Sequence, residues 1–249
     1  MTTQLLIYNN AAPITRAGHG DCFVEVGGTF DFSADINSVP LMAVEFPHAA
    51  SEYAVVFGGS GTEVTPAVIL GVRGTENLFL GEGGTWTGKY VPAFLRRYPF
   101  VFSQNDDRLV LCIDESYPGL NREGRGQPLF AADGAPSPYV DGVVKFLQDY
   151  QAQFEATKRV CAHLVSLGLL EPMQAQVTMT EGTNLSLGGF MAVNRDKLKA
   201  LPAATLAEMA QSDELEMIHL HLHSLRNFDG LRDRLSARLT AEKPTSGVH

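Results

Sequence analysis

The feature that most constrains the fold is a long run of helical periodicity in the second half of the chain. Ser137 can cap a helix that starts at Pro138, and the pattern then continues to Gly168. The residues that recur at alternating steps of three and four are Val140, Val143, Leu147, Tyr150, Phe154, Thr157, Cys161 and Leu164. At 1.5 Å per residue, a helix of about thirty residues spans about 45 Å, which is longer than a small domain is wide. The pattern predicts one amphipathic helix that crosses the molecule and unites its β-rich half with its C-terminal part.

Short β-rich runs fill the first half of the chain. They occupy residues 4–8, 22–26, 54–57, 67–72, 100–103 and 109–113. Clusters of Gly, Asn and Asp separate these runs, as turns separate strands. After the long helix, alternating runs at 174–180 and 185–193 flank the segment 181–184, which predicts a hairpin. Strands are therefore expected both before and after the long helix.

The C-terminal region predicts two further helices. Asp213, followed three residues later by Glu216, resembles a capping box at the start of the first one. The core stripe expected for this helix is Leu215, Ile218, Leu222 and Leu225, and that of the last helix is Leu231, Leu235 and Leu239.

Strands and helices that alternate without a regular βαβ repeat indicate the α+β class. We expect a mixed or largely antiparallel sheet packed against the one long helix and the C-terminal helices. A single domain is expected over residues 1–243, and the tail 244–249 is expected to be disordered.

Charge and hydropathy exclude two classes of partner. The chain has 28 acidic and 19 basic side chains, for a net charge of −9, which opposes binding to nucleic acid. Its apolar runs are all shorter than the 18 or so residues that a membrane helix needs, so no membrane insertion is expected.

Cysteine usage and the N-terminus indicate the compartment. Cys22, Cys112 and Cys161 are odd in number and far apart, which is typical of free buried thiols in a reducing compartment. Residues 1–16 show no secretory signal, because no basic residue precedes the short apolar run that ends at Tyr8. We therefore expect a cytoplasmic protein.

A cluster of histidines raises the possibility of a metal site. His219, His221 and His223 lie within five residues, and imidazole is a common ligand of transition metals. On a helix, His219 and His223 share a face with Glu216, whereas His221 points about 160° away. Glu216, His219 and His223 are thus the candidate metal ligands, and polar flanks of a half-buried helix are the alternative.

Other motifs are incomplete. The segment 83–90 resembles a phosphate loop, but Tyr90 stands where Ser or Thr should follow Lys89, and Pro92 interrupts the expected helix. The chain has no Gly-x-Ser-x-Gly elbow and no dinucleotide fingerprint. No cofactor is expected, and whether the protein is an enzyme stays open.

The segment 77–100 concentrates unusual residues for an acidic protein. It contains the only tryptophan, Trp86, together with Tyr90, Arg96 and Arg97. Arginine beside aromatic rings can bind a carboxylate or phosphate, or form an interface hot spot. The alternative is that both arginines form salt bridges and cover the core while the tryptophan packs.

In this same segment the chain resembles a known family, SapC. The resemblance rests on residues 44–46, 53–57, 67–71, 77–79, Trp86, Tyr90-Val91-Pro92-Ala93, 95–100, 129–130, 188–190 and 224–225. It covers roughly residues 13–230, and the block from Tyr90 to Phe100 is its most specific part; the stretch 51–54 departs from the family pattern. The resemblance implies a bacterial protein linked by name to surface-layer systems, and it supplies no established reaction or catalytic residues.

Three functions are consistent with these observations. The first is a cytoplasmic accessory or binding protein of a cell-surface or outer-membrane uptake system, which contacts a peptide, a protein partner or a small anionic ligand. Its site residues would be Asn77, Trp86, Tyr90, Arg96 and Arg97. The second is an enzyme of unfamiliar type acting on a peptide or small molecule, with Glu45 and His48 as an acid–base pair beside the arginines. The third is a metal-binding protein that uses the histidine cluster.

Overall fold

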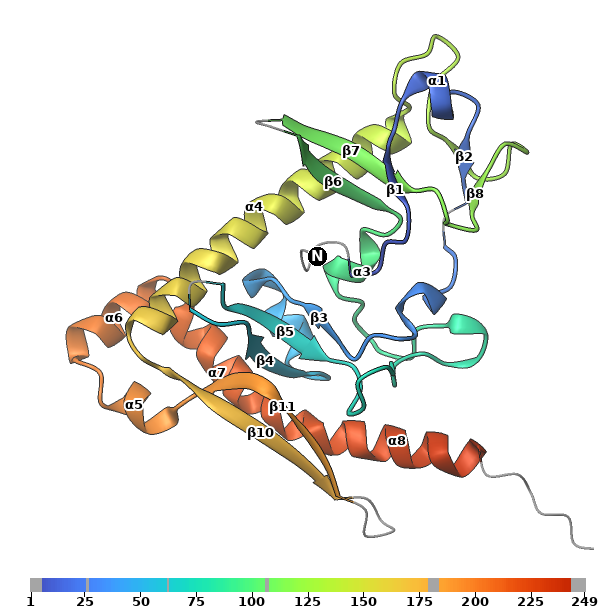
Figure 1. The fold of residues 1–249 in the computed structure, drawn as a ribbon. Coiled ribbons are helices and arrows are strands. Elements are labelled where there is room, and N and C mark those ends of the chain that lie inside the picture. Colours follow the sequence, from blue (N-terminus) through green and yellow to red (C-terminus); the bar gives the residue numbers. More distant parts are fainter. Residues whose placement is uncertain (1–5, 26, 62, 106–107, 179–183, 243–249) are drawn as a thin grey trace, which may run out of the picture.

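The long helix predicted from the sequence dominates the structure. The computed structural model describes residues 6–25, 27–61, 63–105, 108–178 and 184–242. Helix α4 spans Pro138–Ser166, and the Ser137 side chain accepts a hydrogen bond from the Val140 amide at its start. It crosses the molecule from the strands β6 and β7 to the C-terminal helices, as expected (Figure 1). The tail 244–249 and the hairpin turn at 181–183 lie outside the described residues.

The largest sheet has five strands in the order β10-β11-β4-β5-β3, and every pairing in it is antiparallel. Its strands are β3 (Ser38–Pro40), β4 (Ala54–Gly58), β5 (Thr65–Ile69), β10 (Leu170–Thr178) and β11 (Asn184–Val193). The predicted hairpin is confirmed as β10 and β11, which add to the edge of the sheet formed by the first half of the chain.

Two smaller antiparallel sheets complete the β structure. One has the order β1-β7-β6 and the other the order β8-β2-β9. Their strands are β1 (Ala11–Pro13), β2 (Phe23–Val24), β6 (Phe100–Asn105), β7 (Arg108–Asp114), β8 (Leu120–Asn121) and β9 (Gln127–Pro128). The α+β class is confirmed. The strand predicted at 4–8 is wrong for its described part, 6–8, where the chain forms a turn and the Tyr8 hydroxyl donates to the Phe100 carbonyl.

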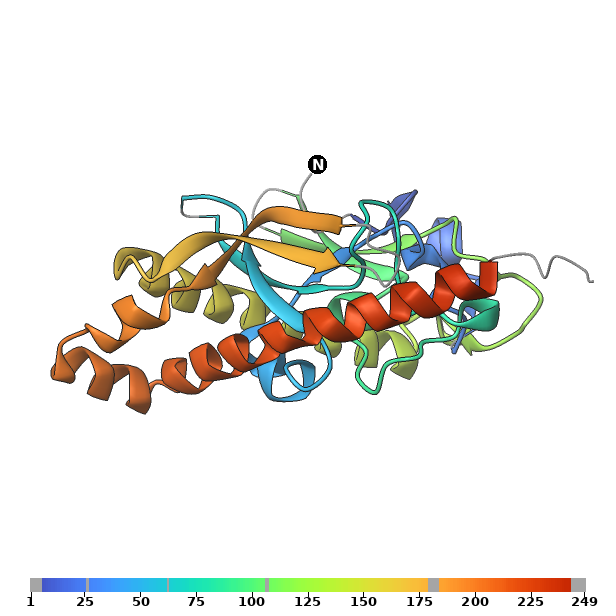
Figure 2. The ribbon, with the colours of Figure 1, turned by 90° about the horizontal axis from the view of Figure 1, so that it is seen from below.

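Short helices connect these sheets, and two longer ones end the chain. They are α1 (Arg16–His19), α2 (Phe46–Ala49), α3 (Ala93–Arg96), α5 (Arg195–Lys199), α6 (Ala203–Gln211), α7 (Glu214–Ser224) and α8 (Phe228–Glu242). The 3-10 turns are η2 (Asp31–Ser33), η3 (Ala43–Glu45), η4 (Glu82–Gly84) and η5 (Leu225–Asn227). Helices α7 and α8 run almost end to end along one side of the molecule (Figure 2). Among the described residues, no helix combines the length and the apolar character that crossing a membrane requires.

Helix α4 joins two hydrophobic cores. Its first half contributes Val140 and Leu147 to a small core under β2, β6 and β7. Its second half contributes Cys161 and Leu164 to the main core, which includes the five-stranded sheet and the C-terminal helices. The three cysteines are free and buried, as predicted. The helix thus links the β-rich half to the C-terminal part.

The start of α7 differs from the prediction. Asp213 has a left-handed backbone, with φ of 61°, and its side chain makes no capping hydrogen bond. An N-cap residue needs an extended backbone to aim its oxygen at the helix amides, so the predicted capping box is wrong. Of the predicted leucine and isoleucine stripe, only Ile218 is fully buried, and the other buried positions are Glu214, Met217, His221 and Ser224.

His221 enters the five-stranded sheet from α7. Strands β4 and β11 are paired at Met191 and Phe57, a register that places Val193 opposite Val55. There the imidazole lies between the strands: Nε2 accepts from the Val193 amide at 3.0 Å, and Nδ1 donates to the Val55 carbonyl at 2.8 Å. The Ser224 hydroxyl accepts from the Val55 amide at 3.0 Å. Side chains of α7 therefore form the hydrogen bonds that backbone groups of β4 and β11 do not form with each other at this point.

Candidate functional site

A cavity of about 310 Å³ lies beside Arg96, and we call it the Arg96 cavity. The segment η3–α2 forms one wall, Tyr90 and α3 form a second, and α4 forms the third. Its lining residues are Met42, Val44, Glu45, His48, Tyr90, Ala93, Arg96, Phe146, Asp149, Tyr150 and Gln153. Three segments that are distant in sequence thus meet at one concave surface.

Glu45 holds two of these walls together. Its side chain is buried, and Oε1 accepts from the Tyr90 hydroxyl and from the Ala93 amide, each at 2.7 Å. Its other oxygen, Oε2, accepts from the Met42 amide at 2.8 Å. Burial and the Glu45 carboxylate raise the pKa of Tyr90 well above its usual value, so this hydroxyl remains a donor. The carboxylate fixes the position of Tyr90 and the start of α3.

Arg96 places an available cation at the mouth of the cavity. Its Nε donates to the Val91 carbonyl at 3.0 Å, and its guanidinium carbon lies 5.8 Å from the Tyr90 ring centroid and 5.5 Å from that of Phe146. The side chain is exposed, and it forms no salt bridge with any carboxylate in the described part of the chain. One of its terminal nitrogens also donates to the Tyr90 hydroxyl at 3.4 Å. Two aromatic rings, a carbonyl and this hydroxyl thus orient the guanidinium, and its remaining N–H groups can bind an anion.

The other polar residues of the cavity are His48, Asp149, Tyr150 and Gln153. The His48 ring stacks on Tyr90, with centroids 5.4 Å apart and an interplanar angle of 19°. Asp149 lies on the exposed side of α4. Tyr150 is 6% exposed, and its hydroxyl is buried with no hydrogen-bond partner in the part of the chain that the structure describes. Burial raises the pKa of Tyr150 to about 12, so the hydroxyl stays neutral.

Arg97, which the sequence paired with Arg96, lies on the other side of α3. It is 3% exposed, and its guanidinium carbon lies 4.3 Å from the Phe94 centroid and 5.0 Å from that of Tyr150. It does not line the Arg96 cavity. The two adjacent arginines therefore have different environments, one at the cavity mouth and one in the core.

Trp86 packs beneath the segment that carries Tyr90. Its Nε1 donates to the Tyr53 hydroxyl and to the Tyr90 carbonyl, each at 3.1 Å. Its ring stacks on Phe79 with centroids 5.8 Å apart. The tryptophan thus supports the wall of the cavity from behind and does not line it.

Asn77 lies away from the cavity. It is 1% exposed, its Nδ2 donates to the carbonyl and hydroxyl of Ser33, and its Oδ1 accepts from the Phe79 amide. The structure therefore brings Tyr90 and Arg96 together with Glu45 and His48, and leaves Asn77, Trp86 and Arg97 in packing positions.

The segment that resembles a phosphate loop holds a carboxylate. The backbone amides of Lys89 and Tyr90 donate to the Glu52 side chain at distances of 2.8 to 3.3 Å. No helix begins directly after Lys89 to offer further amides, since α3 starts only at Ala93. The amides that would hold a phosphate already have an anionic partner.

The proposed metal ligands are exposed on α7. His219 and His223 lie on the exposed face with Glu216, and His221 lies on the buried face, as helical geometry predicted. His219 Nδ1 is hydrogen-bonded to the Leu215 carbonyl at 2.7 Å. Within the described residues, no group of three or more His, Cys, Asp or Glu side chains is arranged to hold a metal ion.

Sequence patterns assign no site role to Tyr150 and Phe146, two residues of α4 that line the cavity. Tyr150 was assigned to the core stripe of the long helix, and Phe146 was not singled out. Both are buried or half-buried residues of an amphipathic helix, so periodicity alone could not separate them from core positions. The sequence offered one chemical signal for Tyr150: a tyrosine in an otherwise apolar stripe carries a hydroxyl that usually needs a hydrogen-bond partner.

Comparison with known proteins agrees with the resemblance at the Tyr90–Phe100 block. The family model described as SapC matches residues 14–231. No curated protein and no solved structure matches the chain. Because the family match covers most of the 249 residues, this chain belongs to the SapC family.

Proposed function

We propose that this SapC family member is a binding protein whose ligand occupies the Arg96 cavity and carries a carboxylate. In this role it serves as a cytoplasmic accessory protein of a bacterial cell-surface or outer-membrane uptake system. The three free buried cysteines support the cytoplasmic location, because free thiols are typical of a reducing compartment. The family name alone supports the link to a cell-surface or uptake system.

The observation that carries the proposal is the exposed guanidinium of Arg96 at the mouth of a largely apolar cavity. The guanidinium is oriented by Tyr90 and Phe146 but has no carboxylate partner among the described residues. Arginine binds a carboxylate with two parallel hydrogen bonds, which a neutral group cannot reproduce.

The remaining lining residues narrow the ligand class. Asp149 repels a second negative charge, which favours a singly charged carboxylate over a phosphate. Met42, Val44 and Phe146 offer apolar surface for the body of the ligand. A peptide that ends in an apolar residue with a free carboxylate has this combination of groups.

Binding fits this geometry better than acid–base catalysis does. Glu45, His48 and Arg96 line one cavity, as an enzyme would require. However, both oxygens of Glu45 already accept hydrogen bonds from the protein, two of them from backbone amides. A general base must have a free lone pair within reach of the proton that it removes. We therefore propose that Glu45 positions Tyr90 and the start of α3 and does not act as a base.

The test compares two probes that differ in one charge. N-acetyl-Leu-Leu with a free carboxylate and the same dipeptide as a C-terminal amide are titrated into the protein by isothermal calorimetry. We expect the carboxylate to bind about tenfold more tightly, because a hydrogen bond to a charged group contributes roughly 1.5–3 kcal/mol.

Two variants assign the difference to Arg96. Arg96→Gln keeps one donor and removes the charge, so the preference for the carboxylate should disappear. Arg159→Gln is the matched control, since Arg159 is an exposed arginine of α4 that does not line the cavity. Equal affinity of both probes for the wild-type protein, or an unchanged preference in Arg96→Gln, contradicts the proposal. A pull-down from the native host with wild-type and Arg96→Gln protein then identifies the natural ligand.

A further inference from the structure

A second cavity, of about 260 Å³, lies further along α4, and we call it the Glu216 cavity. It is formed between α2, the C-terminal half of α4 and the start of α7. Its apolar lining includes Phe46, Val160, Met217 and Leu220, and acidic side chains at its rim include Asp213 and Glu216. The cavity thus has an apolar floor and an acidic edge.

Val44 connects the two cavities. It lines both of them, and at 58% exposure it is among the few large apolar side chains that face solvent in the described residues. Next to it, the Ala43 amide donates to the Thr157 hydroxyl at 2.9 Å, which fixes this segment on α4. The two cavities therefore form one path along α4, with Val44 between them.

The length of this path follows from the helix beside it. Tyr150 lines the Arg96 cavity and Val160 lines the Glu216 cavity. Ten residues of helix rise about 15 Å, and an extended chain covers that distance in four or five residues. Each cavity has room for one or two side chains, whereas a helix with its side chains is about 10 Å wide. The path fits an extended segment.

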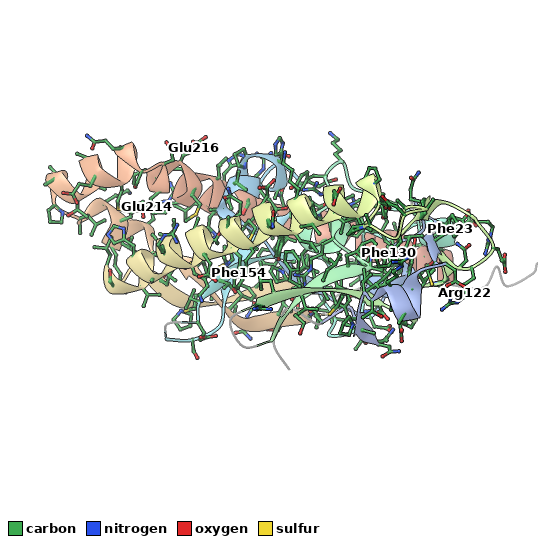
Figure 3. The ribbon with its side chains drawn as sticks, turned by 90° about the horizontal axis from the view of Figure 1, so that it is seen from above. Phe23, Arg122, Phe130, Phe154, Glu214 and Glu216 are labelled. Carbon is green, nitrogen blue, oxygen red and sulfur yellow. The ribbon has the colours of Figure 1, made fainter. Side chains whose placement is uncertain are left out.

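The two ends of the path carry opposite charges. Arg96 provides a cation at one end. At the other end, Asp213 and Glu216 are exposed and form no salt bridge within the described part of the chain, whereas Glu214 is held by His163 at 2.8 Å. Glu216 lies on the outer edge of α7, and Glu214 lies on the side facing α4 (Figure 3). The free acids at this end therefore attract a cation.

We propose that the path binds an extended peptide segment in one direction, with its carboxylate at Arg96, apolar side chains in both cavities and a basic side chain at Glu216. This inference rests on the proposed function, because the carboxylate end is the ligand group assigned to the Arg96 cavity. It adds the length, the direction and the basic residue of the ligand.

The probe is the N-acetylated heptapeptide Lys-Leu-Ser-Ser-Ser-Leu-Leu with a free carboxylate, titrated by isothermal calorimetry. Its C-terminal dipeptide is the short probe used above, and its leucines at the second and sixth positions match the spacing of the cavities. We expect it to bind at least tenfold more tightly than N-acetyl-Leu-Leu. Replacing its lysine by glutamate should weaken binding about threefold to fivefold, the range of an exposed ion pair.

A charge reversal tests the direction of the peptide. Glu216→Lys should reverse the preference, so that the glutamate peptide binds more tightly than the lysine peptide. Glu208→Lys is the matched control, because Glu208 is an exposed acid of α6 that lines neither cavity, and it should keep the wild-type preference. Both positions are exposed, and melting temperatures will verify that both variants remain folded.

The outcomes separate this inference from the proposed function. If the heptapeptide binds no more tightly than the dipeptide, or if Glu216→Lys keeps the wild-type preference, the path is refuted and the Arg96 cavity remains a binding site. If the dipeptide itself shows no dependence on Arg96, the proposed function fails and the path fails with it.

Discussion

Replacing His221 by phenylalanine should destabilise the protein severely. The imidazole accepts from the Val193 amide and donates to the Val55 carbonyl, and both backbone groups lie inside the sheet. The phenylalanine ring would occupy the same space, so the two strands could not move together and pair. It would form no hydrogen bond with the Val193 amide or with the Val55 carbonyl. Leaving a buried backbone group without a partner costs about 1–3 kcal/mol, so two such groups should cost about 2–6 kcal/mol. This is a large part of the stability of a typical domain.

The same histidine should make stability depend on pH. Burial lowers the pKa of His221 to about 4 from its usual value of 6.5. Between these two values the unfolded chain binds a proton that the folded protein does not, so the free energy of unfolding rises with pH. The contribution is fully present above pH 6.5 and is lost as the pH falls to 4. A shift of this size corresponds to about 3 kcal/mol.

Urea unfolding followed by circular dichroism, at several pH values from 4 to 7.5, measures both effects. His221→Phe should lose about 2–6 kcal/mol at pH 7 and should show a flatter dependence on pH than the wild type. His219→Ala is the control in the same helix, because His219 is exposed, and it should stay within about 0.5 kcal/mol of the wild type. Wild-type stability in His221→Phe, or parallel pH profiles for the two proteins, would refute this account of the sheet.

The remaining predictions concern the Arg96 cavity and its supports. Arg97→Ala should lower the free energy of unfolding in urea by about 3 kcal/mol, because it removes a buried side chain that packs between aromatic rings. Arg96→Ala should lower it by only about 0–1 kcal/mol, because Arg96 is exposed. Equal losses in the two variants would contradict the different environments of the two arginines. Tyr150→Phe should leave the melting temperature unchanged or higher, because the hydroxyl that it removes has no partner among the described residues, and a drop of several degrees would reveal a hidden one. Glu45→Gln should lower both the melting temperature and the affinity for N-acetyl-Leu-Leu, and unchanged affinity would show that the carboxylate does not position Tyr90 and α3.

Several elements could be predicted from the sequence because their signals are local. The boundaries of α4, a helix of 29 residues, follow from the cap at Ser137 and from the stripe that repeats from Val140 to Leu164. The β10–β11 hairpin follows from alternation on both sides of a turn, and the α+β class follows from the order of the elements. The block from Tyr90 to Phe100 also identified the family, which the match over residues 14–231 confirms.

The start of α7 shows where local signals fail. Asp213 and Glu216 have the spacing of a capping box, but the chain reaches α7 through a left-handed residue, so the cap does not form. Which face of this helix is buried was decided by the sheet beneath it. His221 and Ser224 satisfy backbone groups of β4, a strand more than 160 residues earlier in the chain.

The candidate site depended on tertiary structure even more strongly. The composition of the segment 77–100 indicates Tyr90, Arg96 and Arg97, and the enzyme hypothesis adds Glu45 and His48 as an acid–base pair beside the arginines. Adjacent residues with helical backbone point about 100° apart, so Arg96 at the end of α3 lines the cavity and Arg97, the next residue, is buried in the core. Glu45 reaches Tyr90 across 45 residues of sequence, and the η3 segment that carries it also contacts α4 through the hydrogen bond between Ala43 and Thr157. Periodicity and capping are properties of neighbouring residues and can be predicted from the sequence, whereas a cavity whose walls are more than 40 residues apart exists only after those segments have packed.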